Sequence, residues 1–216
     1  MIRILLADDH AILRQGLRRM LEEEAGFEVI GEAADGFETI ERVRELKPDV
    51  LVVDLVMPKL NGLEVTSRVK QEPDPPRVVV LSMRKSEPYI MEALRNGADG
   101  YVLKSEDPRD MINAIHAVAA GSTYLSPVVA DLAVEAYLQS SRRLKPDPYD
   151  ELTDREKEVF QLSAEGMSTE DIAEFLTLSV HTVATHRRNM MGKLNIKNQA
   201  ELITYAIKRG VISQDF

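Results

Sequence analysis

Side chains that suit phosphoryl chemistry stand at the expected carboxyl ends of four apolar strand candidates. They are Asp8, Asp9, Asp54, Ser82 and Lys104. Ligands of open parallel sheets bind at the carboxyl ends of the strands. We therefore expect these five side chains to converge at one edge of a sheet.

The chemistry of this set favours an acidic phosphoryl site. Clustered carboxylates repel each other, and a hard cation such as Mg²⁺, which prefers oxygen ligands, relieves that repulsion. We expect Asp8, Asp9 and Asp54 to hold Mg²⁺ and Asp54 to act as the nucleophile that accepts a phosphoryl group. Lys104 would screen the phosphoryl oxygens as a compact positive charge, and the hydroxyl of Ser82 would donate to one of them.

Strand and helix patterns alternate through the first 120 residues, which is typical of a parallel sheet covered by helices on both faces. Amphipathic helix candidates lie near 11–23, 37–46, 62–71, 87–96 and 108–120. The apolar strand candidates are Ile2–Ala7, Glu28–Ala33, Val50–Asp54, Val78–Ser82 and Gly100–Lys104. The pattern predicts an α/β fold with a five-stranded, doubly wound parallel sheet.

The pattern changes after Gly121. Residues 127–138 form one more helix candidate, whose apolar surface must pack on one of its neighbours, and the polar, proline-containing segment 140–150 is typical of a linker. Beyond it, Thr153, Ser168, Ser179 and Asn198 each stand where a helix could begin. The last third of the chain is therefore predicted to be a small all-α domain of four short helices.

Composition excludes several classes of protein. The chain has 216 residues and no cysteine, so disulfides and thiolate metal sites are excluded. No apolar stretch approaches the ~20 residues of a membrane span, and we expect a cytoplasmic protein with no membrane partner. The net charge of −9 hides a local asymmetry, because 151–179 has 2 basic and 8 acidic residues whereas 180–216 has 6 and 2.

The stretches LLADDH, VLVVDLVMPKLNG, VVVLS and ADGYVLK resemble the receiver domain of bacterial two-component response regulators over residues 1–120. The resemblance implies that Asp54 accepts phosphate from a sensor histidine kinase. It also implies that the backbone carbonyl of Val56 joins the Mg²⁺ ligands, and that Ser82 and Tyr101 form a switch pair with Lys104 nearby. In that switch the hydroxyl moves toward the phosphoryl group and the aromatic ring turns inward.

Two positions depart from the common receiver pattern. Ser105 stands where many receivers have a proline after the lysine, so we do not expect the cis bond that such receivers carry. Met83 stands where many have a small residue after the serine or threonine. A bulkier neighbour there would hinder access to the phosphoryl group.

Residues 168–194 predict a helix, a tight turn and a second helix. In the second helix Val183 and Met190 lie on an apolar stripe, and Arg188 lies at the centre of the opposite, small and polar face. Such a face can enter the major groove of DNA, while Lys193 near the helix end would contact a phosphate. The residues expected to contact DNA are His181, Thr182, Ala184, Thr185, Arg187, Arg188 and Lys193.

The whole stretch 151–212 resembles the LuxR-type helix-turn-helix domain. This resemblance implies that 180–194 is the recognition helix and that 198–209 forms a dimer contact. The apolar candidates for that contact are Leu202, Ile203, Tyr205 and Ala206. Family members usually have Lys at the position of His181 and Glu at that of Ala184, so a different base preference is expected.

Together these patterns predict a two-component response regulator of the NarL/FixJ type. It would contain a receiver at 1–121, a linker helix and linker at 122–150, and a DNA-binding domain at 151–216. Phosphorylation would switch homodimerisation and binding to a double-stranded operator.

Two alternatives remain open. Phosphatases of the haloacid-dehalogenase type also form an aspartyl phosphate, but they carry a second Asp two residues after the nucleophile, where this chain has Val56. We therefore expect a phosphoacceptor and not an enzyme. A DNA-binding module that works without phosphate is the other alternative, and the intact acidic site argues against it.

Overall fold

The structure is a computed structural model that describes residues 1–140 and 147–212. Its contacts divide the chain into two units, one that holds most of residues 1–140 and one that holds 147–212. The greater part of the linker expected at 140–150, residues 141–146, lies outside the described residues. Among the described helices, none is long and apolar enough to cross a membrane.

A parallel sheet forms the centre of the first unit, with strand order β2-β1-β3-β4-β5-β6. The strands are nearly continuous runs of apolar residues, because helices bury both faces of the sheet. The predicted doubly wound α/β sheet is confirmed. The strands are β1 (Ile2–Ala7), β2 (Phe27–Ala33), β3 (Val50–Asp54), β4 (Arg77–Ser82), β5 (Gly100–Leu103) and β6 (Tyr124–Leu125).

The sixth strand corrects the predicted count of five. Tyr124 and Leu125 pair in parallel with Gly100 and Tyr101 at the edge of the sheet. A strand of two residues is too short to show a periodic pattern, so the sequence assigned it to the segment that connects the domains.

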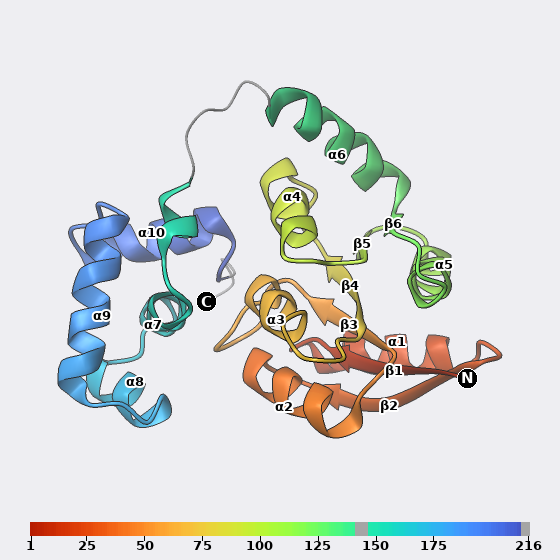
Figure 1. Cartoon of the computed structure of the whole chain (residues 1–216), viewed down its shortest axis with the longest axis horizontal. Helices are drawn as coiled ribbons and strands as arrows, with labels where there is room; N and C mark the ends of the chain where they lie inside the picture. The colour runs from red at the N-terminus through yellow and green to blue at the C-terminus, as the bar shows by residue number, and fades with distance from the viewer. Residues whose placement is uncertain (141–146, 213–216) are drawn as a thin grey trace. The chain divides into compact units, whose positions relative to one another are not determined.

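Five helices cover the two faces of this sheet (Figure 1). Side chains of α1 and α5 pack on one face, where Leu21, Met111 and Ile115 join the alternate strand residues in one apolar cluster. Helices α2, α3 and α4 follow one another over the other face. The bounds are α1 (Ala11–Glu22), α2 (Gly36–Leu46), α3 (Gly62–Val69), α4 (Glu87–Arg95) and α5 (Pro108–Ala119).

Helix α6 (Pro127–Ser140) belongs to the same unit and lies along α4 (Figure 1). The side chain of Val129 is fully buried there, whereas Val128 and Val134 stay exposed. The expectation that this helix packs on a neighbouring domain is confirmed for the first unit.

The second unit consists of short helices around a separate apolar core. Its four α-helices begin at the predicted caps: Thr153 and Ser168 form complete capping boxes, and the side chains of Ser179 and Asn198 accept from the third backbone N–H of their helices. The elements are the 3₁₀ helix η1 (Pro148–Glu151), α7 (Asp154–Ala164), α8 (Thr169–Phe175), α9 (Val180–Lys193) and α10 (Gln199–Arg209).

Candidate functional site

Asp8, Asp54 and Lys104 meet at the carboxyl ends of β1, β3 and β5. Ala7 and Val53 are paired in register, so the aspartates that follow them lie side by side where the direction of strand order reverses. The ammonium of Lys104 lies 2.7 Å from Asp8 Oδ2 and 2.8 Å from Asp54 Oδ2, and all three side chains are buried. The predicted convergence is therefore present for these three side chains, while the roles of these residues stay a prediction.

Burial controls the ionisation of this group of charges. It raises the pKa of Asp54 to about 6, although the positive charge of Lys104 acts in the opposite direction. Burial also works against the charged form of Lys104, but the carboxylates of Asp54 and Asp8 outweigh it and raise the pKa of the ammonium. Near neutral pH the site therefore holds an ionised Asp54 beside a fixed positive charge.

The mouth of the site is more exposed. Asp9 and His10 follow Asp8, and His10 Nδ1 lies 2.8 Å from Asp9 Oδ1 and 3.3 Å from Asp8 Oδ1. One side-chain ligand atom from each of Asp8, Asp9, His10 and Asp54 falls within 4.8 Å of the others. The site is thus open to solvent on the side of Asp9 and closed on the side of Lys104.

The turn after β3 brings the backbone unusually close to Asp54. A Cβ on Gly62 would overlap the carbonyl oxygen of Asp54, and the N–H of Gly62 donates to the carbonyl of Leu55 at 2.9 Å. The side chain of Asn61 accepts from two backbone N–H groups and starts α3. The Asn-Gly pair of the stretch VLVVDLVMPKLNG therefore closes the loop that follows Asp54.

Ser82 and Tyr101 both contact the backbone of Arg84. The N–H of Arg84 donates to Ser82 Oγ at 2.9 Å, and the hydroxyl of Tyr101 donates to the Arg84 carbonyl at 2.7 Å. The side chain of Tyr101 is fully buried, and this burial raises its pKa to about 12. The structure thus records the inward position of the ring, and the switching movement stays a prediction.

The helix α9 has one buried and one exposed face. Val183 and Met190 are fully buried in the helical core, as the stripe predicts, whereas His181 and Arg188 are exposed. Thr182, Ala184 and Thr185 are half-buried in this unit. The helix therefore presents a small, polar surface with a cation at its centre.

The two halves of the chain match two known families. Residues 4–116 match the response regulator receiver domain, and residues 150–206 match the bacterial regulatory proteins of the luxR family. The oxygen regulatory protein NreC of Staphylococcus carnosus is 36% identical over 215 residues, which are 98% of this chain and 99% of that protein. NreC of Staphylococcus aureus is 37% identical over the same shares.

Solved structures agree with these matches. A LuxR-family response regulator from Aurantimonas superposes with a TM-score of 0.62 at 38% identity, and covers 64% of this chain and 99% of that one. RcsB of Salmonella enterica serovar Typhimurium, bound to promoter P1flhDC with the phosphomimetic BeF₃⁻, has a TM-score of 0.61 at 29% identity, covering 94% and 97%. The chain belongs to the NarL/FixJ family of response regulators.

The donor set of this response regulator fits the metal that receivers use. Asp8, Asp9 and Asp54 offer carboxylate oxygens, which are the ligands that Mg²⁺ prefers, and their ligand atoms converge. The backbone N–H of Val56 interacts with the Asp54 carboxylate, so this residue is held next to the site, and the role of its carbonyl as a ligand stays a prediction. His10 also lies in this group, and its position directly after two aspartates is the sequence signal for it.

Two of the predicted DNA contacts of this response regulator have partners inside their own unit. Lys193 Nζ donates to Glu156 Oε2 at 2.6 Å, and Arg187 Nη2 donates to Gln199 Oε1 at 2.6 Å. The hydrogen bond to Glu156 changes the expectation for Lys193, because it connects α9 to α7. To contact a phosphate, the ammonium of Lys193 must break this hydrogen bond or share its protons between Glu156 and the phosphate. Arg188 has no such contact among the described residues, and its side chain is exposed.

The expected dimer residues of α10 separate into two groups. Leu202 and Ala206 are fully buried in the core of the helical unit, so their side chains are not available to a partner. That part of the expectation is corrected, because the apolar face of a short helix first serves its own domain. Ile203 and Tyr205 are half-buried, and the hydroxyl of Tyr205 donates to Asp147 Oδ1 at 2.9 Å.

Proposed function

We propose that this response regulator is a DNA-binding transcription factor that is switched when Asp54 accepts a phosphoryl group from a sensor histidine kinase. One observation carries the proposal: a buried carboxylate at a strand end lies 2.8 Å from a lysine ammonium and beside a second aspartate. Buried ion pairs between a lysine and one carboxylate are common in protein structures. A second carboxylate on the same ammonium and further acidic residues at the mouth of the site are suited to phosphoryl transfer.

We assign a task in the transfer to each side chain. A carboxylate oxygen of Asp54 forms the new bond to phosphorus while the bond between phosphorus and its donor breaks, and the donor leaves with the electron pair. The ammonium of Lys104 faces the negative charge that the phosphoryl oxygens carry. The hydroxyl of Ser82, one strand away, would donate to one of these oxygens.

Asp8, Asp9 and Asp54, with the carbonyl of Val56, would hold Mg²⁺. When bound, the ion supplies positive charge that screens the repulsion between the carboxylates and the incoming phosphoryl group. The residues of the chain orient the ion, because Asp8 is fixed on one side by Lys104 and Asp9 lies at the open side. Tyr101 and Ser82 would then respond together, since both are tied to the backbone of Arg84.

The output would be binding of a homodimer to a double-stranded operator. Support comes from the exposed polar face of α9 and from the related protein RcsB, whose structure is described as bound to a promoter. His181, Thr182, Ala184, Thr185 and Arg188 would face the major groove. Ile203 and Tyr205 are the remaining dimer candidates on α10.

The proposal extends to the domain limits and to the absence of turnover. We assign the receiver to 1–121, the connecting helix and linker to 122–150, and the DNA-binding domain to 151–216. Val56 occupies the position where a related phosphatase would carry a general acid, so the protein acts as a phosphoacceptor and not as an enzyme. Because the proposed partners are a kinase and DNA, we propose a cytoplasmic location.

The test selects DNA and then measures phosphate dependence. Binding sites are enriched from random-sequence duplexes by protein treated with acetyl phosphate and Mg²⁺. The selected duplex is then titrated with treated and untreated wild type and with Asp54→Asn. We expect tighter binding only for treated wild type. Equal binding by all three samples would show that DNA binding does not depend on this site.

A further inference from the structure

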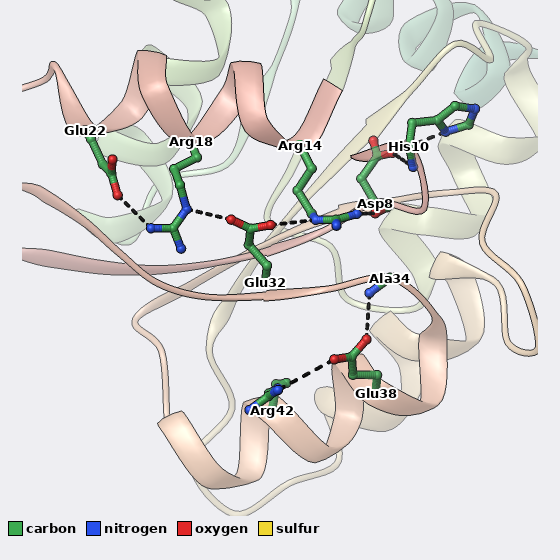
Figure 2. Close-up of polar contacts among 9 residues, drawn as sticks. All are labelled: Asp8, His10, Arg14, Arg18, Glu22, Glu32, Ala34, Glu38 and Arg42. Atoms are coloured by element: carbon green, nitrogen blue, oxygen red, sulfur yellow. Dashed lines mark hydrogen bonds and ion pairs between the residues drawn. The ribbon is translucent and has the colours of Figure 1, made fainter. Parts of the chain in front are cut away.

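A chain of charges runs from the acidic loop along α1 to β2 (Figure 2). Arg14 Nη1 donates to the backbone carbonyl of Asp8 at 2.5 Å, and Arg14 Nε donates to Glu32 Oε2 at 2.7 Å. The other oxygen of Glu32 accepts from Arg18 Nε at 2.6 Å, and Arg18 Nη1 donates to Glu22 at 2.9 Å. Among these charged side chains, Arg14 is the one that reaches Asp8, which is expected to hold the metal.

The loop at Asp8 is fixed at several points, and Arg14 supplies the side-chain contact to its backbone carbonyl. The N–H of Asp8 donates to the carbonyl of Ala33 at 3.2 Å, and the N–H of His10 donates to Asp8 Oδ1 at 2.8 Å. The side chain of Arg14 is only 15% exposed, so it is held within the fold. A rigid fork that bonds two partners fixes the turn between β1 and α1 more firmly than a flexible ammonium would.

Glu32 makes this arrangement compatible with a cation site. A lone guanidinium near the carboxylates would repel a divalent ion. The hydrogen bond from Arg14, with the help of Arg18, lowers the pKa of Glu32 even though burial acts in the opposite direction. Glu32 therefore stays ionised and compensates the charge of Arg14, which leaves the hydrogen bond to Asp8 as the main effect of Arg14 on the site.

We propose that Arg14 is a positioning residue for the divalent-cation site, because it ties the Asp8 carbonyl to Glu32 and so orients the carboxylates of Asp8 and Asp9. The inference rests on the proposed function, which assigns Mg²⁺ to these carboxylates. Residues that orient metal ligands affect metal affinity by about 10-fold or more.

The chain contains a matched control. Arg18 lies one turn further along α1, carries the same charge and bonds the same Glu32, but the structure gives it no hydrogen bond to Asp8. Mg²⁺ dissociation constants are measured by calorimetry on the full-length wild type, Arg14→Ala, Arg14→Lys, Arg18→Ala and Asp9→Ala. Thermal unfolding of each sample shows whether it is folded.

We expect the dissociation constant to rise about 10-fold for Arg14→Ala and less than about twofold for Arg18→Ala. Arg14→Lys keeps the charge but lacks the fork, so its constant should stay closer to that of Arg14→Ala than to wild type. If Arg14→Ala does not fold, the comparison of Arg14→Lys with Arg18→Ala decides.

Equal constants for the Arg14 and Arg18 variants, or full recovery with Lys, would overturn the inference while the metal site stands. If the wild type binds no Mg²⁺, or if Asp9→Ala binds Mg²⁺ as tightly as the wild type does, the metal assignment in the proposed function is wrong. This inference is then wrong as well.

Discussion

Replacing Asp54 with Asn should stabilise the receiver unit at neutral pH. Asp54 is 5% exposed, and the pKa of its carboxyl rises from 3.8 to about 6 on folding because burial disfavours the charge. The folded state therefore binds more protons than the unfolded state between about pH 4 and 6, and stability is lost as pH rises through this window. Asn keeps the shape of the side chain and removes the charge.

The magnitude follows from the difference between the two pKa values. At about 1.4 kcal/mol per pKa unit, the penalty for ionised Asp54 reaches about 3 kcal/mol above pH 7 and falls to about half of that at pH 5. The gain from Asp54→Asn should follow the same profile. Glu45→Gln, at an exposed carboxylate of α2, serves as the control and should change little.

Hydrogen exchange in mild urea, measured without Mg²⁺ on peptides that cover β3, gives the free energy of unfolding of this unit separately from the helical unit. The reasoning predicts a larger gain at pH 7.5 than at pH 5. A variant that is less stable than wild type at pH 7.5, or a gain of the same size at both pH values, would refute it.

Three further predictions concern other parts of the molecule. Lys104→Met leaves two buried carboxylates without their cation, and urea titration should show a free energy of unfolding that is lower by about 3 kcal/mol. An unchanged urea midpoint would mean that the ion pair does not stabilise the fold. Gly62→Ala places a methyl group on the carbonyl oxygen of Asp54 and should lower the melting temperature. Gly16→Ala in α1 meets no atom within 4 Å and should raise the melting temperature. A shift of the same sign for both variants would contradict the close approach at Gly62. Arg188→Ala should weaken binding to a selected operator by about 1–3 kcal/mol and relax the base preference of the protein. Lys208→Ala, at an exposed lysine of α10, should not relax that preference. Titrations of the operator that are the same for the two variants would show that the face of α9 is misassigned.

Patterns that arise within one element could be predicted from the sequence. The apolar run before Asp54 indicated a strand that is buried on both faces, and its carboxyl end placed Asp54 correctly next to Asp8 and Lys104. The polar residues at the start of α7 and α8 gave helix starts that the capping boxes confirm. Such signals are local, because they depend on residues a few positions apart.

Contacts between distant elements could not be predicted in the same way. The pair between Lys193 and Glu156 joins residues 37 positions apart, and nothing in either helix alone indicates it. The bond from Arg14 to Glu32 depends on how α1 crosses β2. The burial of Leu202 was ambiguous, because an apolar residue of a short helix can serve its own core or a partner.

The position of the phosphoryl group tests the central claim most directly. The wild type and Asp54→Asn are incubated with acetyl phosphate, with and without Mg²⁺, and their intact masses are followed over time. The account predicts that the wild type gains one phosphoryl group only when Mg²⁺ is present and that Asp54→Asn gains none. Equal labelling of the two proteins at the same rate would contradict it.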